Sequence, residues 1–216
     1  MAKVGLQIKF QTRNLRPRIL KAISKTLRPK LSGIAIRISK KIQLRFKQLI
    51  LLHPTIKDIL DRKQIRGELG VNREETRINN IVDTWIGGLI LNTKPVMTSA
   101  TSVRGGFILQ MVKSDWSEVL SLPDAWITER TIRPLDWLNW LLTEGSKTVV
   151  IDYDFELNAG QGRTGQGRML KNFKRRLWSV PPAYQGTQDN NFATQTIDRI
   201  HVEIPNMIED EFERAL

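Results

Sequence analysis

The sequence predicts an α+β fold in which a small mixed or antiparallel sheet packs with helices, a long basic helix lies near the N-terminus and another helix lies near the C-terminus. Apolar residues recur at helical spacing over residues 15–53 and again over residues 190–212, whereas residues 148–157 alternate between apolar and acidic side chains as a strand does. A chain of 216 residues that is 40% hydrophobic and lacks cysteine can bury a core without a disulfide or metal. We therefore expect one α+β domain over residues 1–216.

The N-terminal region predicts a short strand followed by the long helix. Residues 4–10 alternate in the manner of a strand, and from Leu15 an apolar residue recurs at every fourth position. Pro29 interrupts this pattern, so we expect the helix to break or kink there. Pro54 should end it, which gives a basic helical arm over residues 1–53.

Short helical segments around residues 56–60 and 68–69 should precede a longer amphipathic helix. Asn72 with Glu75 three residues later forms a pair typical of a helix start, and one apolar face follows as far as Leu89. This pattern is the strongest helical signal in the chain.

A hairpin and a buried helix are expected in the middle of the chain. Residues 96–101 and 106–112 should pair around a turn at Arg104-Gly105, and residues 126–128 could add a short strand. Pro134 suits the first turn of a helix over residues 135–142, which is apolar on almost all sides and should therefore be buried.

Residues 148–157 predict one half-buried strand, with a core face formed by Val149, Ile151, Tyr153, Phe155 and Leu157. A Gly/Arg-rich loop over residues 158–177 should follow, and residues 178–182 should be extended because of their two prolines. The last helix should start near Asp189 or Asn190. Pro205 lies within that helix and should kink or split it.

The positive charge is concentrated in the first quarter of the chain. Residues 1–53 contain 14 of the 34 Lys and Arg residues, and no acid precedes Asp58, so this arm has a charge of +14. Because the net charge of the chain is +12, the remainder has a charge of −2. A cationic arm on a nearly neutral body is typical of a chain that lies beside an anionic partner. Nucleic acid, an anionic membrane and an acidic protein surface all have the required charge.

Two groups of cations are candidates for contact with DNA or with a partner protein. On the long helix, Arg37, Lys41 and Arg45 stack at positions i, i+4 and i+8, where like charges repel one another in an isolated helix. The Gly/Arg-rich loop supplies the second group: Arg163, Arg168, Lys171, Lys174, Arg175 and Arg176.

Two acidic groups are candidates for docking a neighbouring subunit. The first lies on one face of the expected strand and consists of Asp152, Asp154 and Glu156. The second lies on the last helix and consists of Glu209, Asp210, Glu211 and Glu213. Acidic side chains of this kind would suit the basic helix of an adjacent copy.

We predict no enzymatic activity, no cofactor and no bound metal. The chain lacks cysteine and has only two histidines, His53 and His201, which leaves little for a thiol nucleophile, a Ser-His-Asp triad or a histidine metal site. Residues 160–165 match GxGxxG, but no strand–turn–helix unit surrounds the match, so a flexible basic loop is favoured over a dinucleotide site. A magnesium-dependent nuclease built on Asp152 and Asp154 is the alternative enzymatic hypothesis. We expect no signal peptide and no membrane-spanning segment.

The segment that begins at Trp178 resembles the C-terminal signature of bacteriophage tail-completion or neck proteins. In that family a Gly/Arg loop precedes a W-x-V-P-P-x-Y-x-G-T turn and a D-N-F helix start, and this chain reads Trp178-Ser-Val-Pro-Pro-Ala-Tyr-Gln-Gly-Thr187 and then Asp189-Asn-Asn-Phe192. Residues 54–60, 67–70 and 81–85 resemble the N-terminal half of the family. The similarity thus touches most of residues 50–200, and the chain departs from the pattern at its second Asn and at Pro205.

The resemblance implies a non-enzymatic virion protein: a subunit of a head–tail joining ring that completes the tail and connects it to the capsid connector. It implies a homo-oligomer, which we expect to be a hexamer with a dodecamer as the alternative. Its expected neighbours are portal-side or adaptor-side connector proteins, the tail tube or tail terminator, and the DNA in the channel, with no membrane partner. The expected location is the virion neck after synthesis in the host cytoplasm. The alternative function is a stand-alone nucleic-acid-binding protein that uses the basic arm.

Overall fold

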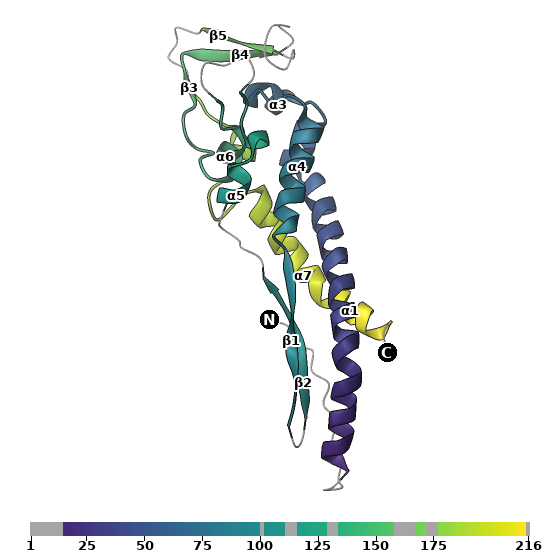
Figure 1. Ribbon diagram of the computed structural model, residues 1–216. Coiled ribbons are helices and arrows are strands. Elements are labelled where there is room, and N and C mark those ends of the chain that lie inside the picture. Colours follow the sequence, from purple (N-terminus) through teal and green to yellow (C-terminus); the bar gives the residue numbers. More distant parts are fainter. Residues whose placement is uncertain are drawn as a thin grey trace. The chain divides into compact units, whose positions relative to one another are not determined.

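The computed structural model describes residues 15–99, 102–110, 116–128, 134–157, 167–171 and 177–214. It confirms the predicted α+β class, with a long N-terminal helix, a C-terminal helix and small antiparallel sheets (Figure 1). Its internal contacts group the chain into two compact units: a first unit of residues 1–45, 88–111 and 201–216, and a second unit of residues 46–87 and 112–200. The single domain expected from the sequence stays a prediction. The strand expected at residues 4–10 lies outside the described residues.

The first unit contains most of helix α1, Arg16–Leu51, which runs through Pro29 without a break. The sequence allowed a break or a kink here, and the prediction of a break was wrong. A proline removes only one backbone donor, and buried residues anchor the helix on both sides of the exposed Pro29, among them Leu20, Leu31 and Ile38.

The first unit also contains an antiparallel hairpin of β1, Ile90–Thr98, and β2, Val103–Gln110. The turn expected at Arg104-Gly105 is wrong, because both residues lie inside β2 and the strands instead reverse between Ser99 and Ser102, whose backbones are hydrogen bonded at 2.8 Å. Gly105 serves close packing: a Cβ there would lie 3.2 Å from Cγ2 of Val96 and 3.7 Å from Cδ1 of Leu31.

Helix α7, Phe192–Glu213, contributes its residues from 201 onward to the first unit. The sequence allowed a kink or a split at Pro205, and because the helix continues through this residue the split was wrong. Phe212 contacts Phe107 of β2 with ring centroids 5.6 Å apart, and Ile204 is buried. These contacts hold the chain on both sides of the proline.

The second unit begins with three helices: α2, Pro54–Leu60, α3, Gln64–Leu69, and α4, Glu74–Gly87. They confirm the helices expected from the sequence. His53 caps α2 through Nδ1, which accepts from the backbone N–H of Thr55 at 3.3 Å. The expected apolar face of α4 is buried at Ile78, Ile81 and Val82.

Two short helices, α5, Ser117–Leu120, and α6, Trp137–Leu142, and the 3₁₀ turn η1, Pro123–Ala125, lie near the centre of the second unit's sequence. Every residue of α6 except Asn139 is buried, which confirms the expectation for this helix. Pro134 precedes α6 rather than starting it. The short strand expected at residues 126–128 is a single bridge between Ile127 and Leu135.

The one strand predicted over residues 148–157 is wrong, because Asp152 interrupts it. Asp152 has a left-handed backbone with φ of 64°, which separates β3, Val150–Ile151, from β4, Tyr153–Leu157. The alternation fails there, and Ile151 and Tyr153 are 58% and 37% exposed rather than in the core.

The two short strands pair with different partners, as β3 pairs with β6, Leu177–Trp178, and β4 with β5, Gly167–Lys171. The Gly/Arg-rich loop expected over residues 158–177 is therefore wrong for residues 167–171 and 177, and the remaining loop residues lie outside the described part. The extended segment after β6 leads to a 3₁₀ turn, η2, Pro182–Tyr184.

Candidate interaction surfaces

The cationic stripe of α1 pairs with acids of α7 inside the first unit. Arg37 donates from Nε to Oε2 of Glu211 at 2.9 Å, and Lys41 forms an ion pair with the same carboxylate. Arg45 donates to both carboxylate oxygens of Glu203, from Nε to Oε2 at 2.7 Å and from Nη2 to Oε1 at 3.0 Å. All three candidate partner-facing cations of α1 thus have counter-ions in their own chain.

Glu211 is the buried member of this group. Its side chain is only 4% exposed, whereas those of Arg37 and Lys41 are 53% and 39% exposed. Hydrogen bonds from Lys41 and Arg37 lower the pKa of the Glu211 carboxyl below its usual value. The stripe therefore has a structural role that requires no partner, and its contact with DNA or protein stays a prediction. The other docking candidates of α7, Glu209, Asp210 and Glu213, are exposed.

Replacing Arg37 and Lys41 with Gln should destabilise the first unit, because buried Glu211 would lose two hydrogen-bond donors and keep the more distant Arg214, whose Nη1 lies 3.6 Å from Oε1. The lowered pKa of Glu211 in the parent gives stability that is present above the ordinary value of about 4.3 and is lost as the pH falls below it. Without Arg37 and Lys41, burial should raise the pKa of Glu211. Protonation of this carboxyl at acidic pH should then stabilise the folded state relative to neutral pH. Urea-unfolding midpoints at neutral and acidic pH measure both effects.

The matched control is Arg18→Gln with Lys40→Gln, which removes one Arg and one Lys from exposed positions of the same helix. It should stay close to the parent at neutral pH. Equal midpoints for the two double variants, or the same acid response in the parent and in the Arg37/Lys41 variant, would contradict the assigned role of Glu211.

The acidic candidates of the second unit do not form one cluster. Asp152 lies at the break between β3 and β4, and its Oδ1 is buried without a partner among the described residues. Glu156 lies opposite Arg168 across β4 and β5, with Oε2 and Nε 3.7 Å apart. Asp154 lies opposite Leu170, and Lys171 opposite Tyr153.

No three metal-binding side chains come together within the described ranges, and the nuclease alternative stays untested. The candidates Arg163, Lys174, Arg175 and Arg176 lie outside the described residues. In the same described part of the chain, no helix combines the length and apolar character needed to cross a bilayer.

An exposed apolar strand pair lies between β3 and β6. Ile151 is paired with Leu177, and their exposed fractions are 58% and 64%. Sequence reasoning missed this surface because the alternation placed Ile151 on the core face. A large apolar pair in water is a candidate contact for another protein surface.

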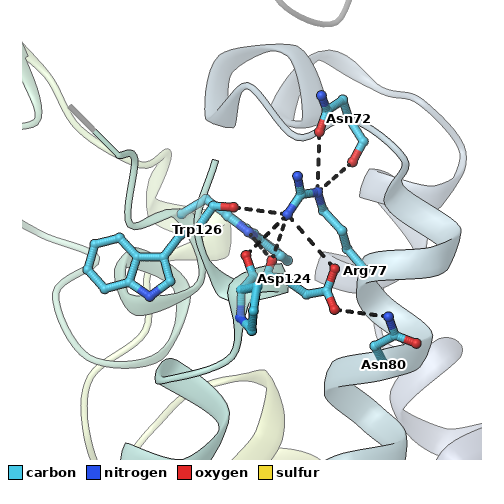
Figure 2. Close-up of polar contacts among 7 residues, drawn as sticks. Asn72, Arg77, Asn80, Asp124 and Trp126 are labelled. Atoms are coloured by element: carbon cyan, nitrogen blue, oxygen red, sulfur yellow. Dashed lines mark hydrogen bonds and ion pairs between the residues drawn. The ribbon is translucent and has the colours of Figure 1, made fainter. Parts of the chain in front are cut away.

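Arg77 of α4 organises a buried network around η1 (Figure 2). Its Nε donates to the backbone oxygen of Asn72 at 3.0 Å, and its Nη1 donates to the backbone oxygen of Trp126 at 2.9 Å. The carbonyls of Pro123 and Asp124 lie at 3.4 Å from the same Nη1. The side chain is 9% exposed. Arg77 therefore fixes a loop and is unavailable to a ligand.

Residues 178–192, which carry the resemblance described above, form a fixed connection between α6 and α7. The Tyr184 hydroxyl donates to Oδ2 of Asp58 at 2.7 Å, and this hydrogen bond, with burial, raises the pKa of Tyr184 to about 12. Asn191 is 1% exposed, and its Oδ1 accepts from the backbone N–H groups of Ala193 and Thr194. Its Nδ2 donates to the backbone oxygen of Leu142 at 2.9 Å. The second Asn of the signature is thus the N-cap of α7.

No family model, curated protein or solved structure matches this chain. A functional assignment therefore depends on its residues and their geometry.

Proposed function

We propose that the chain is a non-enzymatic structural subunit of a tailed-bacteriophage neck, which assembles with copies of itself into a ring that completes the tail and joins it to the capsid connector. The observation that carries the proposal is the resemblance of residues 178–192 to the neck-protein signature. Portal-side or adaptor-side connector proteins and the tail tube or tail terminator are the partners that such a subunit would contact.

The geometry of this segment supports a structural role. Tyr184 ties η2 to Asp58 of α2, and Asn191 ties the start of α7 to the end of α6. Gly186 lies so close to α6 that a Cβ would be 1.7 Å from the backbone oxygen of Leu141. Residues used in this way build a rigid joint, as a subunit that transmits contacts between neighbours requires.

The strand pair Ile151–Leu177 is the surface best suited to a neighbouring copy. Both side chains are more than half exposed, and a partner that removes apolar side chains from water lowers the free energy of the system. The centre of a protein interface is more apolar than its rim. We therefore assign this pair to the contact between subunits of the ring.

Native mass measurement tests the proposal. The parent should form a species at a multiple of 24.9 kDa, with six copies expected, alone or with connector and tail-tube proteins. Replacing Ile151 and Leu177 with Thr, which suits strands, should shift the population toward a single chain.

The matched control is Met97→Thr with Ile108→Thr, which changes two exposed apolar strand residues in the first unit. This control should assemble as the parent does. A parent that remains at 24.9 kDa with all of these neighbours present would contradict the proposal. Equal losses of assembly in both variants would contradict the assigned interface.

A further inference from the structure

The N-terminal half of α1 presents a ridge of four exposed cations: Arg18, Lys21, Lys25 and Arg28. Their spacing of three, four and three residues places them on one face of the helix, over about 15 Å at a rise of 1.5 Å per residue. We call these four residues the basic ridge. It lies on a different part of the helix from Arg37, Lys41 and Arg45, whose charges α7 compensates.

The first unit holds no acid that compensates the basic ridge. This unit contains sixteen Lys and Arg residues and five acids, so it carries +11 of the chain's net charge of +12. All five acids lie within residues 203–213, and Glu203 and Glu211 are bound to the stripe farther along α1. Among the described residues, no ion pair involves the basic ridge.

The arrangement is unfavourable for an isolated helix. Each neighbouring pair of the ridge has like charges at i, i+3 or i, i+4, where they repel. The first turn of α1 contains Arg18 and no acid, although the positive end of a helix dipole favours anions. A bound polyanion would relieve both effects.

The side chains on the exposed face of this stretch favour one kind of anionic partner over the others. A helix that lies on a membrane needs a row of large apolar side chains in its exposed face. Leu15, just before the ridge, is 57% exposed, but Leu20 is 1% exposed and Ile19 and Ile23 are partly buried, so Leu15 does not continue into such a row there. A protein interface usually has an apolar centre as well, and the ridge is cationic along its whole length. A nucleic acid backbone presents only regular negative charge to such a surface.

We infer that the basic ridge binds the phosphate backbone of a nucleic acid duplex. Arg and Lys contacts to phosphates position a protein without reading bases, so binding is expected to be independent of sequence. This inference requires no ring, because the ridge is complete in one chain.

The test compares two quadruple variants of the full chain. The ridge variant carries Arg18→Gln, Lys21→Gln, Lys25→Gln and Arg28→Gln. The control carries Lys57→Gln, Arg73→Gln, Lys147→Gln and Arg199→Gln, which remove the same number of Arg and Lys charges from exposed positions of the second unit. Fluorescence anisotropy of a labelled duplex DNA of about 20 base pairs measures affinity from about 50 to 200 mM salt.

The ridge variant should bind about tenfold or more weakly at the lowest salt, and its dependence of log affinity on log salt should flatten by about 0.9 for each phosphate that the variant no longer neutralises. The control should change much less in both measures. Circular dichroism should show the parent's helix content in both variants, because Gln has nearly the helix propensity of Lys and Arg.

Equal weakening in the two variants would overturn the inference, since it would reduce DNA binding to overall charge. Tighter binding of the parent to polyglutamate or to phosphatidylserine vesicles than to the duplex would overturn it as well. A single 24.9 kDa chain that binds DNA through the ridge would support this inference while contradicting the proposed ring.

Discussion

Gly186→Ala is expected to cost the second unit about 3 kcal/mol or more, or to prevent it from folding. The added Cβ would lie 1.7 Å from the backbone oxygen of Leu141 and 2.9 Å from Cβ of Asn191. Gly145 closes the other side, because its N–H donates to the oxygen of Gly186 at 3.0 Å and a Cβ there would lie 2.5 Å from the nitrogen of Gly186. The two nearest atoms both belong to the backbone of Leu141, so a change of side-chain rotamer would not make room for the methyl group.

Gly87→Ala is the control for this prediction. A Cβ at Gly87 would meet nothing within 4 Å, and the residue lies in helix α4, where Ala is favoured over Gly. Its effect should stay within about 1 kcal/mol of the parent and should be stabilising if it differs. Urea unfolding followed by tryptophan fluorescence measures both variants, and similar midpoints for the two would show that the joint can open to admit a methyl group.

Arg77→Met should destabilise the second unit by about 2 to 4 kcal/mol. Methionine can fill much of the volume, but it donates no hydrogen bond to the carbonyls of Asn72 and Trp126. Buried carbonyls that lose their donor carry a desolvation cost. Asp124 would also lose its ion-pair partner, whose Nη1 lies 3.9 Å from Oδ1, while Asn80 would still donate to its side chain (Figure 2).

Two control substitutions separate this role from a general loss of charge. Arg199→Met removes an exposed cation from α7 in the same unit and should have little effect. Arg77→Lys keeps the charge but has no planar fork that can reach two sets of carbonyls, so it should lie between the parent and Arg77→Met. Urea midpoints and near-ultraviolet circular dichroism measure the changes, since Trp137 donates to the backbone oxygen of Asp124 at 2.9 Å. Equal stability of the Met and Lys variants would contradict the network.

The helices that could be predicted are those whose pattern lies within a few turns. Helix α4 has its apolar face at regular spacing, and α6 is apolar on nearly every side, so local periodicity was sufficient. The strand over residues 148–157 failed because one left-handed residue, Asp152, does not alter the alternation of the sequence. The hairpin turn failed because Gly105 serves close packing in β2, a role that the sequence does not distinguish from a turn.

The candidate surfaces were predictable in type and not in partner. The spacing of Arg37, Lys41 and Arg45 indicated a charged stripe, but their partners lie far away in the sequence. Glu203 follows Arg45 by 158 positions, and Glu211 follows Arg37 by 174. Nothing local in the sequence specifies such a pairing. Arg77 was missed because its acceptors are mostly backbone carbonyls, which every residue possesses.

The sequence separation between the cations of α1 and their acidic partners on α7 determines when these ion pairs can form during synthesis. Helix α1 leaves the ribosome well before the acids of the first unit, which all follow residue 200. Residues 46–87 and 112–200 are therefore all present before Arg37, Lys41 and Arg45 can meet Glu203 and Glu211. Contacts of such high sequence separation form late because closing the intervening loop costs entropy. During translation Arg37, Lys41 and Arg45 therefore lack these counter-ions until the part of the chain beyond residue 200 has been made.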